Sequence, residues 1–100
     1  MVNYLLNNEQ LNDKISNGIV IVDFFANWCG PCRMLSPILE EIASDKINVI
    51  KVDIDKFEEL TRSFKIMSVP TIQIYKNKEL KKQITGFLSK EELLNVIKSI

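Results

Sequence analysis

A chain of 100 residues is long enough for one globular domain, and we expect residues 1–100 to form a single one. Hydrophobic residues make up 46% of it and charged residues 26%, which is typical of a soluble protein with its own core. Because 13 basic residues balance 13 acidic ones and no block of like charge occurs, we expect no binding to nucleic acid or to an anionic membrane.

No stretch of the sequence reaches the ~18–20 apolar residues that a transmembrane helix needs. The N-terminal residues lack the basic start and the apolar stretch of a secretory signal peptide. We therefore expect a cytoplasmic protein, in a compartment where most thiols are kept reduced.

The first part of the chain predicts a strand, a helix and a second strand. Residues 2–5 are compatible with a short strand, and residues 8–17 with a helix that Asn8 caps and Gly18 ends. The run over 19–26 is almost continuously apolar and rich in β-branched and aromatic residues. Such a run is typical of a central parallel strand that is covered on both faces.

The middle of the chain continues this alternation. Apolar residues recur at helical spacing from 29 to about 44, and Pro37 is expected to kink that helix because it removes a backbone donor. Residues 47–54 predict a second buried strand, and residues 57–64 a short amphipathic helix.

The last third predicts a hairpin followed by a helix. Strands over 71–75 and 81–85 are joined by a turn at residues 77–78, so they are antiparallel. A capping box at residues 89–92 begins the final helix. The earlier strand–helix–strand units require parallel, right-handed crossovers, so we expect a mixed sheet between layers of helices.

The most informative segment is WCGPC at residues 28–32, which holds the only two cysteines and the only tryptophan. Two thiols three residues apart at a helix start can close into a disulfide and reopen, so the segment predicts a redox centre. A purely structural disulfide is a less favoured alternative in a cytosolic chain. With two cysteines and no histidine, one chain cannot supply the usual set of four nitrogen and sulfur ligands of a zinc site, so we expect no metal. An iron–sulfur cluster shared between two chains is the other metal alternative, and Pro31 disfavours it.

The whole length of the chain resembles the thioredoxin family. Besides WCGPC, the resemblance rests on VDF at 22–24, KVDID at 51–55, VPT at 69–71 and GFLSK at 86–90. It implies the thioredoxin fold, an α/β fold with a central mixed five-stranded sheet flanked by four helices. It also implies a protein-disulfide reductase whose dithiol cycles through Cys29 and Cys32.

The two cysteines are expected to have different roles. Cys29 is predicted at the first helical position, where free N–H groups and the helix macrodipole lower the pKa of a thiol. Its thiolate attacks a substrate disulfide, and the deeper, more buried Cys32 resolves the mixed disulfide. Helical geometry places the two Cα atoms about 5 Å apart, which permits a Cys29–Cys32 disulfide. Gly30 allows a partner chain to approach closely, and Pro31 stiffens the segment and tunes its redox behaviour.

Asp23 interrupts an apolar strand, where an unpaired carboxylate is costly and tends to stay protonated. From the residues alone, a structural, hydrogen-bonded role is as well supported as a functional one. The resemblance favours function and implies that Asp23 accepts the proton of Cys32 through water. Lys51, in the adjacent strand, is expected to pair with Asp23 and tune its charge, although an edge-exposed lysine is equally compatible with the sequence.

Pro70 stands at the start of a strand, which is unremarkable by itself. The resemblance implies that its peptide bond with Val69 is cis, that it packs against the disulfide, and that Val69 keeps backbone groups free to pair with a substrate strand. Trp28 is expected to be partly exposed, in a shallow apolar patch for protein substrates. The other members of this patch are Gly30, Pro31, Val69, Gly86 and Phe87. Taken singly, Gly86 and Phe87 are as compatible with a structural role.

Two positions depart from the family pattern. Phe25 stands where a tryptophan is common, which affects packing more than chemistry. The usual Asn-Gly hairpin turn is Asn77-Lys78 here. A type I′ turn would place Lys78 at positive φ, so the sequence leaves the turn type open.

The resemblance further implies that no cofactor is bound and that an NADPH- and FAD-dependent thioredoxin reductase recharges the dithiol. Expected substrates are disulfide proteins such as peroxiredoxins, methionine sulfoxide reductases and ribonucleotide reductase. We expect a monomer that serves general redox homeostasis and electron transport. Two alternatives stay open: a disulfide oxidase or isomerase on the same fold, and a scaffold or subunit whose thiols are dispensable. A reduction potential tests the first alternative, and cysteine variants test the second.

Overall fold

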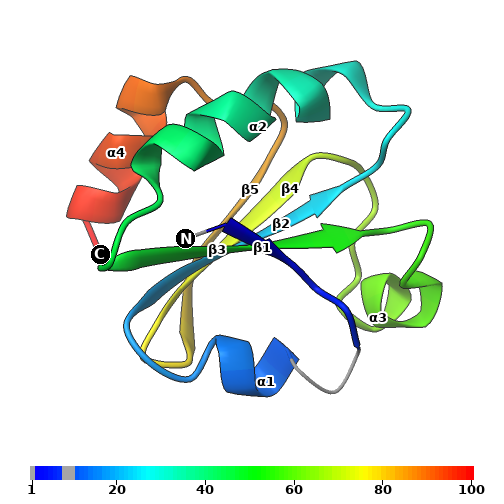
Figure 1. The fold of residues 1–100 in the computed structure, drawn as a ribbon, viewed down its shortest axis with the longest axis horizontal. Helices are drawn as coiled ribbons and strands as arrows, with labels where there is room; N and C mark the ends of the chain where they lie inside the picture. Colours follow the sequence, from blue (N-terminus) through cyan, green and yellow to red (C-terminus); the bar gives the residue numbers. More distant parts are fainter. Residues whose placement is uncertain (1, 8–10) are drawn as a thin grey trace.

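The computed structural model of the chain describes residues 2–7 and 11–100 (Figure 1). Its elements are, in order, β1 (Val2–Tyr4), α1 (Leu11–Lys14), β2 (Ile19–Phe25), α2 (Gly30–Ile42), β3 (Ile47–Asp53), α3 (Glu58–Ser63), β4 (Thr71–Lys76), β5 (Glu79–Thr85) and α4 (Lys90–Lys98). This succession confirms the predicted order of strands and helices. The expected N-cap Asn8 lies outside the described residues.

Within these residues the strands form one mixed five-stranded sheet in the order β1-β3-β2-β4-β5. β2 runs parallel to β3, and β3 in turn runs parallel to β1. β4 runs antiparallel to both β2 and β5. The long apolar run of β2 is therefore the central strand, as its composition predicted.

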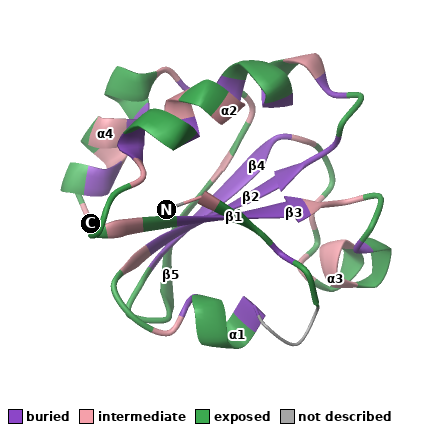
Figure 2. Ribbon diagram, in the orientation of Figure 1, coloured by how far each residue is buried: buried purple, intermediate pink, exposed green. Residues whose placement is uncertain are grey.

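Helices cover both faces of the sheet: α2 and α4 pack on one face, and α1 and α3 on the other (Figure 1). Alternate residues of β2 point to the two faces, so Ile21 packs in the cluster of α2 and α4 while Val20, Val22 and Phe24 pack in the opposite cluster. Figure 2 shows the resulting band of buried residues along the central strands. Both faces of β2 are thus closed to solvent.

Two helices begin or end differently from the sequence prediction. α1 ends at Lys14, and Gly18, at φ +70°, lies after it at the start of β2. α2 begins at Gly30 rather than Cys29, and Pro37 lies inside it. The expected kink at Pro37 stays a prediction.

The hairpin turn between β4 and β5 places Asn77 at φ +50° and Lys78 at φ +74°. Two positive φ values in succession are typical of a type I′ turn, which answers the question that the sequence left open. The side chain of Asn77 accepts a hydrogen bond of 2.9 Å from the backbone N–H of Gly18, so the turn is tied to the start of β2.

Lys78→Gly is expected to raise the free energy of unfolding by about 0.5–1 kcal/mol, because glycine removes the Cβ strain of a left-handed residue. Chemical denaturation measures this change. Lys82→Gly is the matched control, since Lys82 is an exposed lysine within β5, where glycine weakens a strand. A destabilised Lys78→Gly protein would contradict the interpretation.

Candidate redox site

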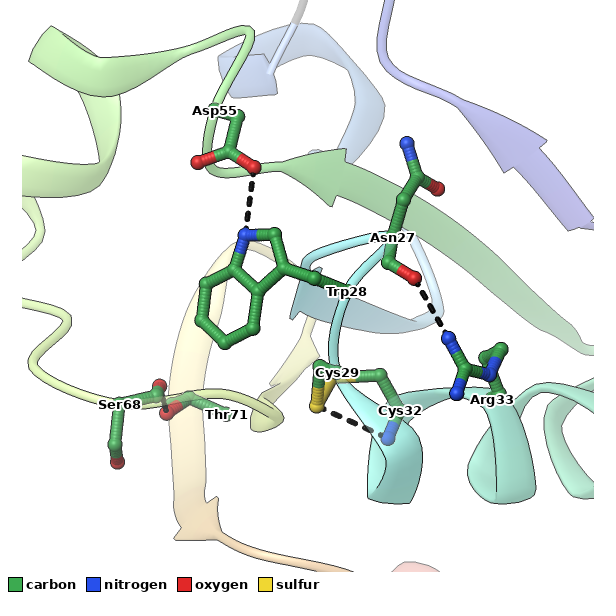
Figure 3. Close-up of a disulfide and its surroundings, with 8 residues drawn as sticks. All are labelled: Asn27, Trp28, Cys29, Cys32, Arg33, Asp55, Ser68 and Thr71. Atoms are coloured by element: carbon green, nitrogen blue, oxygen red, sulfur yellow. Dashed lines mark hydrogen bonds between the residues drawn. A yellow bond between two sulfur atoms is a disulfide. The ribbon is translucent and has the colours of Figure 1, made fainter.

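Cys29 and Cys32 form a disulfide at the point where the chain leaves β2 and begins α2 (Figure 3). Their Cα atoms are 5.3 Å apart. Both residues are buried, with 5% of Cys29 and 2% of Cys32 exposed, so the expected difference in burial has the predicted direction but is small. Redox chemistry at this disulfide therefore requires a partner that approaches from the protein surface.

The predicted position of Cys29 in the helix is wrong by one residue. Cys29 is the N-cap of α2, with extended backbone, and its Sγ accepts a hydrogen bond of 3.2 Å from the backbone N–H of Cys32 (Figure 3). An N-cap side chain faces the free N–H groups at the positive end of the helix, as a first-turn side chain does. The backbone N–H of Cys32 is therefore a direct hydrogen-bond donor that favours the expected thiolate at Cys29.

Trp28 is 67% exposed, which confirms the expectation that it lies at the surface beside the thiols. Its indole N–H donates a hydrogen bond of 2.9 Å to the Asp55 carboxylate (Figure 3). Asp55 follows β3, and its backbone N–H in turn donates 2.9 Å to Asp53 Oδ1. Sequence reasoning did not identify Asp55 as part of the site, because the bond joins residues 27 positions apart and no local pattern indicates it.

The Val69–Pro70 peptide bond is cis, as the resemblance implied. Val69 packs against the cluster of Phe25, Ala26 and the two cysteines, which brings this loop to the disulfide. Within the described part of the chain, no residue is hydrogen-bonded to the backbone N–H or carbonyl of Val69. An extended partner chain could therefore pair with it.

Neighbouring groups hold this loop in place. The backbone N–H of Gly86 donates 2.8 Å to the carbonyl of Pro70, and the Thr71 hydroxyl donates 2.7 Å to the carbonyl of Ser68. Gly86 has φ +92°, a conformation that L side chains rarely adopt. The backbone at position 86 therefore favours glycine for a structural reason.

Exposed apolar side chains flank the disulfide segment and its neighbouring loops. Phe87, next to Gly86, is 43% exposed, and Pro31 is exposed between the cysteines. Two further exposed apolar side chains, which sequence reasoning did not identify, lie near these segments in sequence: Met34 on α2 is 62% exposed, and Met67, two residues before Val69, is 92% exposed. Their exposure could not be read from the chain, because a methionine at helical or loop spacing is equally typical of a core.

Asp23 is fully buried on β2, and neither of its carboxylate oxygens has a hydrogen-bond partner among the described residues. Burial raises the pKa of Asp23 from 3.8 to about 6, and the positive charge of Lys51 opposes that rise. No described residue thus supplies the hydrogen bond that a purely structural aspartate would need. Asp23 is a carboxyl group that changes charge close to neutral pH.

Lys51 lies opposite Asp23 in the register of β2 and β3. It is only 5% exposed, so the alternative of an edge-exposed lysine is wrong: β3 is an interior strand, between β1 and β2. Its Nζ donates a hydrogen bond of 2.9 Å to Ser36 Oγ and lies 4.7 Å from the centroid of the Phe25 ring. The expected pairing with Asp23 thus acts through space, without a hydrogen bond.

A cavity of about 150 Å³ lies beside these groups. Its lining residues are Tyr4, Phe25, Ala26, Asn27, Cys32, Arg33, Ser36 and Lys51. Asp23 is outside this lining, whereas both Cys32 and Lys51 contribute to it. The cavity has polar walls and room for several water molecules, so proton transfer by way of water is physically possible next to Cys32.

Comparison with known proteins places this geometry in a family. The family model described as Thioredoxin matches residues 2–99 of the chain. The chain belongs to the thioredoxin family. A thioredoxin of Staphylococcus saprophyticus is 43% identical over an alignment of 89 residues that covers 86% of each chain. A thioredoxin of Listeria monocytogenes is 45% identical over an alignment of 87 residues that covers 84% of each chain.

Solved thioredoxin structures agree with the fold. A mutant thioredoxin from Halobacterium salinarum superimposes with a TM-score of 0.91 at 32% identity, covering 98% of this chain and 88% of the other. The solution structure of oxidised thioredoxin from Plasmodium falciparum superimposes with a TM-score of 0.85 at 36% identity. The match covers 99% of this chain and 97% of the other. The predicted thioredoxin fold is confirmed.

The chain is a thiol–disulfide oxidoreductase with a protein-disulfide reductase role, and its redox-active group is the Cys29–Cys32 disulfide. Family membership implies a thioredoxin reductase and disulfide substrates as its general partners. Within residues 2–7 and 11–100, no cluster of three or more potential metal-binding side chains occurs. Over the same residues, no helix is long and apolar enough to cross a membrane.

The unpaired carboxyl of Asp23 predicts a pH-dependent stability. Its pKa is about 6 in the folded protein against 3.8 ordinarily, so between these pH values the unfolded chain binds fewer protons and stability falls as pH rises. At pH 7 the ionised, buried carboxylate lowers the free energy of unfolding by its full amount, about 3 kcal/mol. Asp23→Ala is expected to raise the free energy of unfolding at pH 7 by about 1–3 kcal/mol, since the small void left by alanine offsets part of the gain.

Urea denaturation at pH 4, 5.5 and 7 measures this effect. The rise in the free energy of unfolding caused by Asp23→Ala should be absent near pH 4 and complete at pH 7. Asp45→Ala, which removes an exposed carboxylate, is the matched control and should change stability little at any of these pH values. Equal gains for Asp23→Ala at pH 4 and pH 7 would show that Asp23 is not a buried carboxyl with a raised pKa.

Proposed function

We propose that this protein is a general cytoplasmic protein-disulfide reductase in which Cys29 attacks and Cys32 resolves. The Cys29 thiolate attacks one sulfur of a substrate disulfide, forms a mixed disulfide and releases the other substrate sulfur as a thiolate. The Cys32 thiolate then attacks Cys29 Sγ and displaces the second substrate sulfur. The substrate gains two electrons and, after protonation, two thiols, while the chain is left with the Cys29–Cys32 disulfide.

The observation that carries this assignment is the placement of the two sulfurs. Cys29 Sγ accepts the backbone N–H of Cys32 at the N-terminus of α2, where negative charge on sulfur is favoured. Cys32 lies inside the helix and lines the cavity beside Lys51. Gly30 and Pro31 form the short connection between them, and we assign to these two residues the tuning of the disulfide.

We assign to Asp23 the acceptance of the Cys32 proton by way of water in the cavity. Its pKa of about 6 makes it ionised, and able to accept a proton, at neutral pH, and protonated below that value. Lys51 tunes this charge from the neighbouring strand. Support comes from the joint presence of Cys32 and Lys51 in the cavity lining and from the register that places Lys51 opposite Asp23.

Substrate proteins are proposed to dock on the apolar surface around the disulfide, formed by Trp28, Gly30, Pro31, Val69, Pro70, Gly86 and Phe87. The unpaired backbone groups of Val69 would pair with an extended substrate segment, which is a common way for a protein to bind a peptide. Exposed Met34 and Met67 extend this surface, and flexible methionine side chains suit a surface that accepts varied partners.

The finer functional context follows from family membership and is proposed on that basis. The chain would act as a monomeric single domain over residues 1–100 and carry electrons in general redox homeostasis. An NADPH- and FAD-dependent thioredoxin reductase would recharge it. Its substrates would include peroxiredoxins, methionine sulfoxide reductases and ribonucleotide reductase.

Cysteine variants test the assignment of attack and resolution. Cys29→Ser should abolish disulfide reduction because the attacking sulfur is gone. Cys32→Ser should also lose turnover but accumulate a mixed disulfide on Cys29, visible by mass spectrometry of the protein incubated with a disulfide substrate. Turnover that survives both substitutions would instead favour a thiol-independent scaffold.

The reduction potential tests the competing oxidase or isomerase function. Equilibration of the wild-type dithiol with glutathione buffers should give a reducing potential, near the roughly −270 mV typical of thioredoxins. A value near that of an oxidase, about −120 mV, would overturn the reductase assignment.

Asp23→Asn tests the proton acceptor. It should slow resolution of the mixed disulfide most strongly above pH 6, where the wild-type carboxyl is ionised. Stopped-flow, single-turnover reduction between pH 5 and 8 measures the rate. A rate that depends on pH as it does in the wild type would refute the assignment.

A further inference from the structure

The Lys51 ammonium is a buried cation whose observed contacts are all uncharged. It donates a hydrogen bond to Ser36 Oγ at 2.9 Å. It also lies 4.7 Å from the ring centroid of Phe25 and 5.5 Å from that of Tyr4. These two rings meet edge to face, with centroids 5.8 Å apart, and form an aromatic wall on one side of the ammonium.

These contacts come from three separate elements. Tyr4 belongs to β1, Phe25 ends β2, and Ser36 projects from α2. The two rings attract the cation without fixing a hydrogen-bond direction. Ser36 Oγ is the one hydrogen-bond acceptor that Lys51 Nζ has among the described residues, so it determines where the ammonium points.

The carboxylate opposite Lys51 in the sheet register is left without a partner. Both oxygens of Asp23 lack hydrogen bonds to the described residues, although Asp23 and Lys51 are register neighbours on the same face of the sheet. Buried charges in proteins are generally paired, so a lysine and an aspartate in register on one face of a sheet are candidates for a direct ion pair. The ammonium is instead hydrogen-bonded to Ser36 Oγ.

We propose that Ser36 is a positioning residue, which holds the Lys51 ammonium at the cavity wall and so prevents a direct ion pair between Lys51 and Asp23. This inference rests on the proposed role of Asp23 as proton acceptor. A directly paired carboxylate would be a weaker base, because the ammonium stabilises its ionised form. Ser36 thereby keeps Asp23 basic enough to take the Cys32 proton.

Removal of the Ser36 hydroxyl takes away the hydrogen-bond acceptor that the described residues offer to the ammonium, and leaves the aromatic wall beside it. The other titratable groups around it are Tyr4 on β1 and Cys32 and Arg33 on α2, all of which line the cavity. None of these three side chains carries a carboxylate. Asp53, two residues along β3, is a second carboxylate on this face, but it already accepts hydrogen bonds from the Asn27 side chain and from the backbone N–H groups of Asp55 and Lys56. The unpartnered Asp23 carboxylate is thus the anion towards which a released Lys51 would turn.

The test measures the titration midpoint of the Asp23 carboxyl by carbon-13 NMR in the oxidised protein. Ser36→Ala should lower the midpoint by about one pH unit, as expected for a new close opposite charge. Ser36→Thr, which retains a hydroxyl, should restore the wild-type midpoint. Lys51→Met should raise the midpoint, because the ammonium that opposes the effect of burial is gone.

The double variant Ser36→Ala/Lys51→Met separates positioning from simple loss of packing. If Ser36 acts through the ammonium, this variant should have the same midpoint as Lys51→Met alone. A midpoint unchanged in Ser36→Ala, or a downward shift that persists without Lys51, overturns the proposal. Both measurements are independent of turnover, so they are distinct from failure of the reductase assignment, which the cysteine variants report.

A kinetic measurement links the position of Lys51 to the reaction. In single-turnover reduction, Ser36→Ala should move the acidic limb of the rate of mixed-disulfide resolution to lower pH and leave the attack by Cys29 unchanged. Ser36→Thr should follow the wild-type profile. A uniform loss of rate at all pH values would indicate a structural defect and would contradict positioning.

Discussion

The burial of β2 on both faces and both edges is the constraint on which the redox site depends. β2 pairs with β3 along its whole length and with β4 along most of it, and helices close both faces. Its register with β3 places Asp23 beside Lys51, and its register with β4 places Phe24 beside Thr71, directly after the cis peptide. Since a closely packed interior resists displacement, the segment that follows β2 is held in a defined position against the Val69 loop.

The buried polar side chains of the core differ in whether they have hydrogen-bond partners. Gln73, buried on the opposite face, donates 2.8 Å to Gln83 and accepts 2.6 Å from the Tyr75 hydroxyl. Asp23 has no such partner among the described residues. Natural cores satisfy nearly all buried polar groups, so this unpaired carboxyl lowers the stability of the fold, and it is the kind of group that the proposed proton transfer would use.

Local chemistry made much of the fold predictable. The capping box is present as expected, with Ser89 Oγ accepting 3.1 Å from Glu92 N–H and the Glu92 carboxylate accepting 3.0 Å from Ser89 N–H. The apolar run at the centre of the first half became the central strand. Cys29 was misplaced by one residue because periodicity marks a helix face, whereas the N-cap depends on where the backbone first turns helical.

The sequence by itself determined the order of elements, the redox motif and the presence of a carboxyl in an apolar strand, because periodicity, caps and residue chemistry are local. Only the tertiary structure decided that Trp28 is bonded to Asp55, that Asn77 is bonded to Gly18 and that Lys51 is bonded to Ser36 rather than Asp23. These bonds join residues 27, 59 and 15 positions apart. Their partners are chosen by strand register and helix packing, which depend on the whole chain at once.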